Sequence, residues 1–527
     1  MSNGVELESQ VAAAEEASRQ RAGRRFWWIW LVVGSLLALF AVGGRWGLPL
    51  AAWMCPVLLL RFTRTSRHWW AATGAVCLAY AGAAAFWMCA NDIPFIAELA
   101  PKLIFGGALL GGAPYIIDRL LGSGIPPLAR LFLFPAMVVS IEFGLITFGP
   151  NGAYYGVLAN TQIGNLALLQ IIAVTGPYGL GFLIGIFATV ANYVWERGAR
   201  SLRVAGAFAA VLAVVVVGGS ARMVFTPTST THTVRIAGVN PSKAAVHSFL
   251  LAAVGETQTK LSENAGMVPV VDPASAPAQA GALLDELFAS TRRAAQAGAK
   301  IVVWSEEAAR ITSMDKPAFL DRAQQVAREA GIYLNVANSV YIPGSMSTRN
   351  ESHFIGPDGT ILWDYDKRHP VPGQEHFTPG RGPIPVVETP YGRIGNVICF
   401  DADFSATMHL DADIMLVPSA GWAHESINHT WMVGLRAIEN GYSLVRQVFD
   451  GRSTAFDYHG NMLSTQDTTT GRKIWLVDVP THGTVTVYRV VGDALAWLSV
   501  IITAAALTAL CFYRNRTTSV SEECDRA

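Results

Sequence analysis

The sequence predicts a two-part protein, in which a bundle of membrane-spanning helices is joined to one water-soluble domain of mixed helices and strands. The chain of 527 residues is 51% hydrophobic and has a mean hydropathy of +0.33, which is too apolar for a purely soluble protein. Its apolar residues gather in runs of the length that a membrane helix needs. One long segment, 226–484, lacks such runs and alternates short β-rich stretches with helical patterns, which is typical of a layered α and β fold.

About eight stretches are apolar enough to be interpreted as helices that cross a hydrocarbon core of about 30 Å. They cover residues 26–42, 48–60, 69–90, 99–117, 128–148, 166–195, 204–219 and 490–513. The second is short, and the fourth and sixth contain Gly and Pro, which neighbouring helices can accommodate. We therefore expect seven helices in an N-terminal transmembrane domain, 1–225, and one helix followed by a cytoplasmic tail in a C-terminal segment, 485–527.

Arginine residues occur in every second loop between these predicted helices and before the first one. They include Arg24, Arg25, Arg61, Arg64, Arg67, Arg119, Arg130, Arg197, Arg200, Arg203, Arg514 and Arg516. Short loops that carry Lys and Arg stay on the cytoplasmic side of a membrane. Both chain ends are therefore expected in the cytoplasm, and the segment 226–484 is expected outside it. We interpret the first apolar run as an uncleaved helix, because further spans follow closely and no small-residue cleavage site ends it.

Charge and cysteine content exclude several classes of function. The chain has 39 basic and 39 acidic residues, so no overall positive field attracts nucleic acid, and we expect no nucleic-acid partner. Its six cysteines form no CxxC pair and no Cys/His spacing of a metal site. We accordingly expect neither a metal nor another cofactor.

A single cysteine, Cys399, occurs in the whole segment 226–484, at the end of an apolar run. A lone thiol is either a small buried hydrophobic residue or a nucleophile. Two other strand-like runs end at Glu306 and Lys367, so three strand ends could bring a carboxylate, an ammonium and a thiol together. Acyl transfer by a thiol needs a base, a donor to the developing oxyanion and a proton for the leaving group, and these residue types supply them. Glu307 is an alternative to Glu306 as the carboxylate.

Three blocks of this segment resemble the catalytic blocks of the carbon–nitrogen hydrolase (nitrilase) superfamily. They are Trp-Ser-Glu at 304–306, the stretch 365–375 around Lys367, and 392–399, which ends at Cys399. The segment Leu-Arg-Ala-Ile-Glu-Asn at 435–440 is also typical of the superfamily. The resemblance covers most of 234–478 and implies a four-layer αββα sandwich with a Glu-Lys-Cys triad.

Carried over by position, the resemblance makes Glu306 the general base, Lys367 the oxyanion stabiliser and Cys399 the nucleophile. It also implies that the backbone N–H of Phe400 helps to bind the oxyanion and that Glu375 supports the site. One branch of the superfamily usually has tyrosine and glutamate directly after this cysteine, whereas this sequence has Phe400 and Asp401.

Each of four other residues allows two interpretations, one functional and one structural. Trp422 lies in a loop that is only loosely similar to the family's, and it either contacts substrate or is a half-buried loop tryptophan. His369 and His376 flank the lysine block as acid–base candidates or, more simply, as surface or positioning groups. Glu142 in the fifth predicted helix either has a function or hydrogen-bonds to a neighbouring helix. Asn350 begins a match to a glycosylation sequon, to which we assign no function.

Several membrane helices around an outward nitrilase-like domain resemble one membrane branch of the superfamily, the bacterial apolipoprotein N-acyltransferases. The stretch 162–191 is similar to that family's span before a cytoplasmic turn. This resemblance implies a multi-pass protein of the bacterial cytoplasmic (inner) membrane, with its catalytic domain on the periplasmic side. The acyl donor would be a phospholipid, the intermediate a thioester on Cys399, and the acceptor the α-amino group of a diacylglyceryl-modified lipoprotein.

Two other functions remain open from the sequence. A membrane-tethered amidase or nitrilase would use the same triad with water as acceptor, although a single anchor helix would then be enough. A transporter or scaffold with an inactive enzyme domain is the other alternative, and the intact order of Glu306, Lys367 and Cys399 argues against it.

Overall fold

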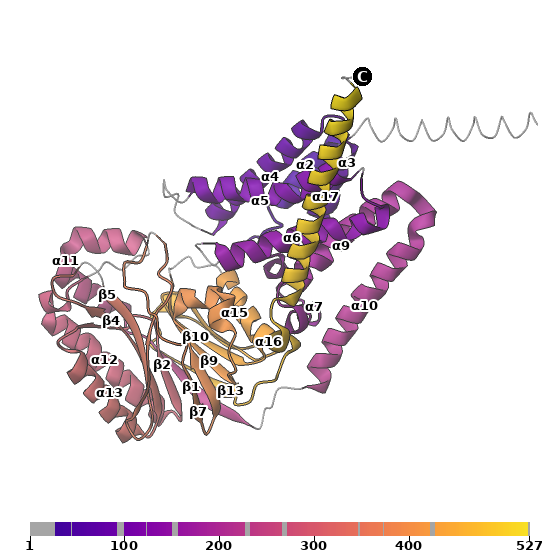
Figure 1. Ribbon diagram of the computed structural model, residues 1–527. Helices are drawn as coiled ribbons and strands as arrows, with labels where there is room; N and C mark the ends of the chain where they lie inside the picture. The colour runs from indigo at the N-terminus through magenta and orange to yellow at the C-terminus, as the bar shows by residue number, and fades with distance from the viewer. Residues whose placement is uncertain are drawn as a thin grey trace, which may run out of the picture.

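The computed structural model describes residues 27–43, 45–91, 100–122, 124–149, 156–226, 232–265, 271–345, 348–372, 374–421 and 427–524. Figure 1 shows two parts, a bundle of helices and a part that contains all the labelled strands. The chain enters the strand-containing part after α10 and returns to the bundle through α17. The predicted fold class, a helical membrane part followed by an α/β domain with two sheets, is confirmed.

The helical part consists of long helices joined by short ones. The long helices are α2 (Trp27–Ala38), α3 (Pro49–Thr65), α4 (Trp69–Ala90), α5 (Ala100–Leu121), α6 (Pro127–Phe148), α9 (Tyr178–Arg197), α10 (Leu202–Phe225) and α17 (Ala494–Cys524). The short ones are η2 (Leu158–Gln162), α7 (Leu166–Leu169), α8 (Ile172–Thr175), η3 (Gly198–Ser201) and α16 (Val487–Val491). Among the described residues, five helices have the length and composition to cross a membrane, namely α4, α5, α6, α9 and α10. The count of eight spans stays a prediction.

Two local features refine the sequence-based description of this part. The sixth predicted span, 166–195, is divided into α7, α8 and α9. The break between α8 and α9 falls at Gly176, which has a φ of 64° and is followed by Pro177. Glu142 of α6 accepts a hydrogen bond of 2.8 Å from the backbone N–H of Leu158, so its carboxylate binds the start of η2 rather than another long helix. Of the two interpretations of Glu142, this contact supports the one in which it hydrogen-bonds to a neighbouring helical segment.

Helix α10 stands at the side of the bundle, as Figure 1 shows. Only 6% of its apolar window is buried, and Val211, Val214 and Val217 are all more than half exposed. A helix that is apolar on its exposed face is suited to a lipid environment.

The α/β part contains two sheets among its described residues. The first has the order β13-β1-β2-β4-β5-β6, with β3 paired to the end of β4. Its strands are β1 (Thr233–Val239), β2 (Ile301–Trp304), β3 (Ala309–Thr312), β4 (Tyr333–Tyr341), β5 (Thr348–Ile355), β6 (Ile361–Asp366) and β13 (Ile474–Pro480). The second has the order β12-β11-β10-β9-β8-β7. Its strands are β7 (Val386–Thr389), β8 (Gly392–Asn396), β9 (Ile414–Ala420), β10 (Ser443–Phe449), β11 (Arg452–Phe456) and β12 (Met462–Asp467).

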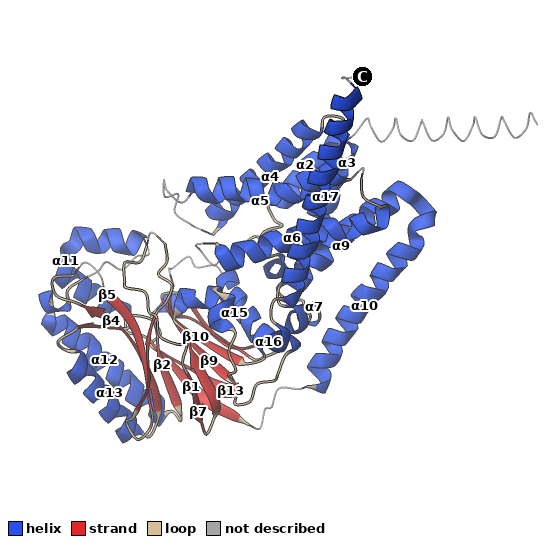
Figure 2. Cartoon of the chain, viewed as in Figure 1, coloured by secondary structure: helices blue, strands red, loops and turns tan. Residues whose placement is uncertain are grey.

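The two sheets pack face to face and helices cover their outer faces, as Figure 2 shows. The core between them joins Ile236 and Phe354 of the first sheet to Ile398 and Val445, which belong to the second sheet and its border. Helices α11 (Lys243–Ala265), α12 (Pro277–Gln296) and α13 (Lys316–Ala330) cover the first sheet, and α15 (Ile427–Asn440) covers the second. The result is a four-layer αββα sandwich.

Strand direction places the candidate site. β1, β2 and β4 run parallel in the first sheet, and β8, β9 and β10 run parallel in the second. β6 is antiparallel to β5, which is antiparallel to β4, so β6 runs in the direction of β2. The carboxyl ends of β2 and β6 therefore lie on the same side of the first sheet, and the chain segments that follow them emerge there.

The helical part and the α/β part share one hydrophobic core. Buried residues of this core come from α6 and α9, such as Phe143 and Leu180, and from the α/β part, such as Val417, Met432 and Phe456. Helix α15 lies between the second sheet and the helical bundle (Figure 1). The two parts are thus packed together through α15.

Candidate active site

Cys399 sits on an unusual backbone turn. It opens the short helix η5 (Cys399–Asp403), three residues after β8 ends. Its φ is +46°, a left-handed conformation that is rare for residues other than glycine and that is found at functional sites more often than elsewhere. This turn carries the thiol to the end of the strand, where 9% of the residue is exposed.

Lys367 lies between two carboxylates at the end of β6. Its ammonium donates to Glu306 Oε1 over 2.7 Å and to both oxygens of Glu375 over 2.8 Å. Lys367 is fully buried and Glu306 is 3% exposed, whereas Glu375 is partly exposed. A buried ion pair of this geometry, with every charge hydrogen-bonded, holds the three side chains in a defined arrangement.

Ala420, at the end of β9, connects the carboxylate to the thiol. Its N–H donates to Glu306 Oε2 over 2.8 Å, and its carbonyl lies 3.6 Å from Cys399 Sγ. The amide of Asn350 on β5 donates to Glu306 Oε1 over 2.8 Å. The structure thus brings Glu306, Lys367 and Cys399 to one place, as their strand-end positions predict.

Asp401 connects residues 365–369, around Lys367, to the turn that carries Cys399 through hydrogen bonds. Its carboxylate accepts hydrogen bonds from the Tyr365 hydroxyl at 2.9 Å, the backbone N–H of Arg368 at 3.1 Å and the N–H of His369 at 2.9 Å. The His369 ring nitrogen Nδ1 lies 2.9 Å from the same carboxylate, and the Ile398 N–H lies 3.3 Å from it. The aspartate therefore serves as a buried acceptor for several donors at once.

Phe400 and His369 both pack on Phe404, which follows η5. The Phe400 ring meets Phe404 edge to face, with centroids 5.4 Å apart, and the His369 ring stacks on it at 3.7 Å. His369 is thus a group that positions the site, which was one of its two interpretations. His376 is exposed.

Burial and the neighbouring charges set the protonation of the site. Burial alone lowers the pKa of the Lys367 ammonium, but Glu306 and Glu375 outweigh it and raise that pKa well above its ordinary value. Burial raises the pKa of the Cys399 thiol and Glu306 raises it further, while Lys367 and Arg446 oppose the increase. Burial also raises the pKa of Glu375 to about 7, against the attraction of Lys367.

Some predicted site residues lie elsewhere, and others were not predicted. Glu307 donates or accepts no hydrogen bond with the triad among the described residues, so the geometry favours Glu306 over it. Trp422 lies outside the described residues. Asn350 and the N–H of Ala420 were missed. Asn350 is one of several buried polar residues of β5, and the sequence gives no signal that separates it from the others.

One group of potential metal ligands lies apart from the triad. Oxygen and nitrogen atoms of Glu351, His353 and Asp364 come within 4.8 Å of one another. The ammonium of Lys316 lies 2.7 Å from Glu351 and already supplies a positive charge there. We therefore interpret the group as a structural ion-pair cluster.

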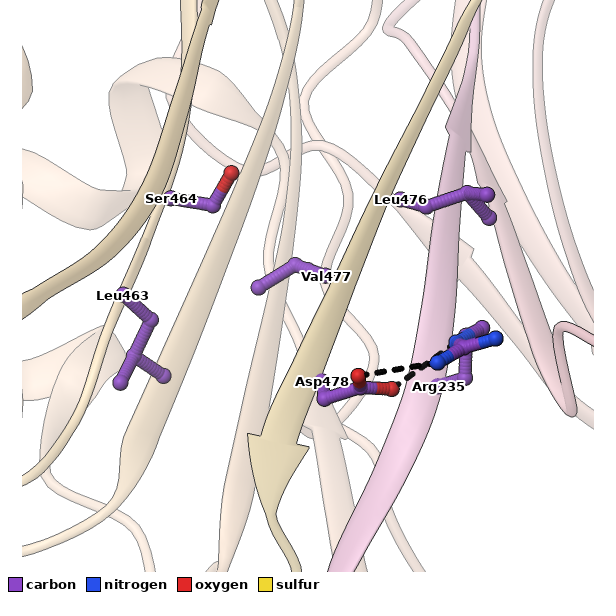
Figure 3. Close-up of a pocket in the computed structure, with 6 residues that line it drawn as sticks. All are labelled: Arg235, Leu463, Ser464, Leu476, Val477 and Asp478. Carbon is purple, nitrogen blue, oxygen red and sulfur yellow. Dashed lines mark hydrogen bonds and ion pairs between the residues drawn. The ribbon is translucent and has the colours of Figure 1, made fainter. Parts of the chain in front are cut away.

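A surface hollow of about 500 Å³ lies between β1, β12 and β13 (Figure 3). Its lining residues are Arg235, Leu463, Ser464, Leu476, Val477 and Asp478. Arg235 is near the beginning of β1, whereas the end of β1 at Val239 contacts Ser305, next to Glu306. The exposed ion pair between Arg235 and Asp478, 3.0 Å long, spans two neighbouring strands and is structural. The hollow is not part of the candidate site.

Comparison with known proteins finds similarity in both parts of the chain. Residues 270–483 match the carbon–nitrogen hydrolase family model, and residues 33–190 match the model of the apolipoprotein N-acyltransferase N-terminal domain. The chain is 24% identical over 440 residues to an apolipoprotein N-acyltransferase of Geobacter metallireducens, covering 76% of this chain and 77% of the relative. It is 37% identical over 100 residues to omega-amidase NIT2 of Xenopus tropicalis, and this match covers 17% of this chain and 36% of the relative.

Among solved structures, the chain is similar to an amidase from Nesterenkonia sp.. The sequence identity is 20% and the TM-score is 0.37, and the match covers 49% of this chain and 94% of that chain. The αββα sandwich and the carbon–nitrogen hydrolase match define the class of protein as a carbon–nitrogen hydrolase with an attached helical membrane part. The matched N-terminal domain and the relative from Geobacter metallireducens specify the branch. The chain belongs to the apolipoprotein N-acyltransferase family.

Proposed function

We propose that the protein moves a fatty acyl chain from a phospholipid to the α-amino group of the S-diacylglyceryl cysteine of apolipoproteins, through a thioester on Cys399. The observation that supports this most is the thiol of Cys399, held on a left-handed turn beside the Glu306–Lys367 pair, in a domain that shares its core with a helical membrane part. A nucleophile fixed at a bilayer surface can meet both lipid substrates.

The first proposed step forms the acyl-enzyme. Cys399 Sγ attacks the ester carbonyl of the phospholipid, and Glu306 takes the thiol proton. The Lys367 ammonium and the backbone N–H of Phe400 stabilise the oxyanion, with Glu375 holding Lys367 in place. The carbon–oxygen bond then breaks, and Glu306 returns its proton to the glycerol oxygen, so a lysophospholipid leaves.

The second proposed step transfers the chain. The uncharged α-amine of the lipoprotein attacks the thioester carbonyl, and Glu306 takes a proton from the amine. The carbon–sulfur bond breaks, and the thiolate of Cys399 receives that proton. One acyl group thus moves from oxygen to sulfur to nitrogen, with ping-pong kinetics and no cofactor.

We also propose the placement of the chain in the membrane. Residues 1–225 form the N-terminal membrane domain, 226–484 the domain that carries the chemistry and 485–527 the closing helix and tail. The arginine-rich loops support a cytoplasmic position for both termini and a periplasmic position for the α/β part.

The test is to trap the thioester. Purified full-length protein in detergent is incubated with a phospholipid labelled in its acyl chains and separated on a gel without reducing agent. We expect label on the protein that hydroxylamine removes and that Cys399→Ala abolishes. Adding a synthetic diacylglyceryl-cysteinyl peptide should then move the label to the peptide amine, detected as the mass of one acyl group.

The alternative is hydrolysis of a small amide by the same triad. Protein that stays unlabelled by every phospholipid offered, but releases ammonia from a small amide in a Cys399-dependent way, would contradict the acyltransferase proposal. The similarity to omega-amidases covers only 15–17% of this chain, which leaves the membrane part without a role in that alternative.

A further inference from the structure

Arg310 is a buried cation for which no part of the described chain supplies an acceptor. It lies on β3, four residues after Glu306, and is 8% exposed. Among the described residues it makes no hydrogen bond or ion pair, and its Nε is fully buried without a partner. Its guanidinium carbon lies 5.9 Å from the ring centroid of Phe249 on α11. A guanidinium carries five N–H donors, and burying it without an acceptor is costly.

The position of Arg310 connects it to the candidate active site. Glu307, the residue after Glu306, has a φ of +49° and lies within the electrostatic range of both Arg310 and Lys367. Burial raises the pKa of the Glu307 carboxyl, and Arg310 partly offsets this. The two side chains nevertheless form no ion pair within 4.0 Å in the part of the chain that the structure describes. Glu307 therefore leaves the donors of Arg310 open.

The acyl donor of the proposed reaction carries a group that the N–H groups of Arg310 can bind. A phospholipid carries its phosphodiester on the same glycerol unit as its acyl esters, so the phosphate lies only a few bonds from the carbonyl that reacts. Four residues span at most about 13 Å even when the chain is fully extended, so the backbone of Arg310 lies within that distance of the backbone of Glu306. Guanidinium binds phosphate oxygens in a bidentate manner, whereas the ammonium of a lipoprotein N-terminus has the wrong sign.

We propose that Arg310 binds the phosphodiester of the donor phospholipid while the ester carbonyl lies at Cys399. This inference rests on the proposed function and adds a headgroup site to it. Binding places an anion against the open N–H groups of Arg310 and fixes the glycerol unit, so that the ester is presented to the thiol in one orientation.

The experiment compares two acyl donors on the full-length protein in detergent. One donor is a phospholipid, and the other is a p-nitrophenyl ester of the same fatty acid, which has no phosphate. We expect Arg310→Met to raise the KM for the phospholipid roughly tenfold to a hundredfold, the range of a lost charge-assisted hydrogen bond, with little change in kcat. Kinetics with the p-nitrophenyl ester should stay as in the unaltered protein. Arg322→Met is the matched control, because Arg322 also packs on a phenylalanine ring but on the surface of α13.

The outcomes separate this inference from the proposed function. Equal loss with both donors, or an unchanged KM for the phospholipid, overturns the phosphate site. Unaltered protein that accepts the p-nitrophenyl ester but no phospholipid overturns the proposed function itself. Arg310→Lys keeps the charge but lacks the planar guanidinium, so its KM for the phospholipid should lie between those of the unaltered protein and Arg310→Met. If Arg310→Met does not fold, the comparison of the two acyl donors with Arg310→Lys tests the phosphate site instead.

Discussion

At the scale of single residues, the reactivity of Cys399 depends on how two carboxylates and two cations balance around its thiol. Glu306 and Glu375 disfavour the thiolate, and Lys367 and Arg446 favour it. The net effect of burial and these charges is a pKa above the ordinary value. This suits a mechanism in which the thiol loses its proton to Glu306 during attack, rather than one in which a free thiolate waits in the site.

Replacing Glu375 by Gln should make the thiol more reactive. The substitution removes a negative charge that raises the pKa of Cys399, so the thiolate fraction at neutral pH should increase. We expect the rate of alkylation by iodoacetamide at pH 7.5 to rise several-fold and its pH profile to move to lower pH. Glu388→Gln on the exposed face of β7 serves as control. A slower reaction, or a profile shifted to higher pH, would show that the charge of Glu375 does not act in this way.

Replacing Lys367 by Met should have the opposite effect. It removes the positive charge that favours the thiolate and leaves Glu306 without its ion-pair partner. Alkylation at pH 7.5 should slow by about tenfold or more, corresponding to at least one pKa unit, and acyl-enzyme formation from phospholipid should stop. If the variant is alkylated as fast as the unaltered protein, the charge of Lys367 does not favour the thiolate of Cys399.

Asp401 should matter for the position of the site rather than for its charge balance. An Asn in its place cannot accept from all the donors that converge on the carboxylate, namely Tyr365, Arg368, His369 and Ile398. We expect the free energy of unfolding to fall by about 1–3 kcal/mol and acyl-enzyme formation to slow at least tenfold. Thermal unfolding in detergent and the labelling assay measure the two effects, with the exposed Asp478→Asn as control. A fully active, equally stable variant contradicts the role.

At the scale of elements, α15 supports the turn that carries the thiol. Arg436 of α15 is fully buried and donates to the carbonyls of Ala402 and Asp403 in η5, to Ser405 and to Glu439. One face of α15 thus holds η5, while the helix also packs on α8 and the shared core. Helix α15 therefore contacts both the turn that carries Cys399 and the core shared with the helical part.

Arg436→Met should therefore weaken both the fold and the turn. Losing one partner of a buried ion pair leaves Glu439 without its cation and the carbonyls of Ala402 and Asp403 without the Arg436 donor, so we expect the free energy of unfolding to drop by about 3–5 kcal/mol. The midpoint of thermal unfolding in detergent measures this. Arg292→Met, which removes an exposed ion pair with Glu329, should change it by far less. Equal, small shifts in both variants would mean that η5 is held by other contacts.

At the scale of the whole molecule, the shared core makes the α/β part dependent on the helical part. Met432, Val433 and Leu435 of α15 are buried in a core that also contains α6 and α9 residues. Residues 232–484 expressed alone should expose this apolar face and aggregate in the absence of detergent. Gel filtration and the alkylation rate of Cys399 provide the check, with the full-length protein as reference. A soluble, monodisperse segment with the native alkylation rate would contradict this dependence.

How far the sequence predicts the site can be seen in particular residues. Glu306, Lys367 and Cys399 each follow a strand-like run, and strands of one sheet that run in the same direction end on the same side, which accounts for Glu306 and Lys367. Cys399 follows a strand of the second sheet, so its approach to the other two depends on how the two sheets pack. The positive φ of Cys399 was not predictable, because the residue type gives no sign of a left-handed turn. Ala420 and Asn350 were missed as well, since one acts through its backbone and the other lies far from the motifs in the chain.

By itself, the sequence determined the two-part organisation and the order of the carboxylate, the ammonium and the thiol, because hydropathy and local periodicity are properties of neighbouring residues. Only the tertiary structure decided that Asp401 ties the lysine block to the Cys399 turn, that α15 joins this turn to the membrane part, and that Arg310 is buried without an acceptor in the described chain. These features depend on contacts between segments tens to hundreds of residues apart. Their geometry is set by packing, which local patterns do not encode.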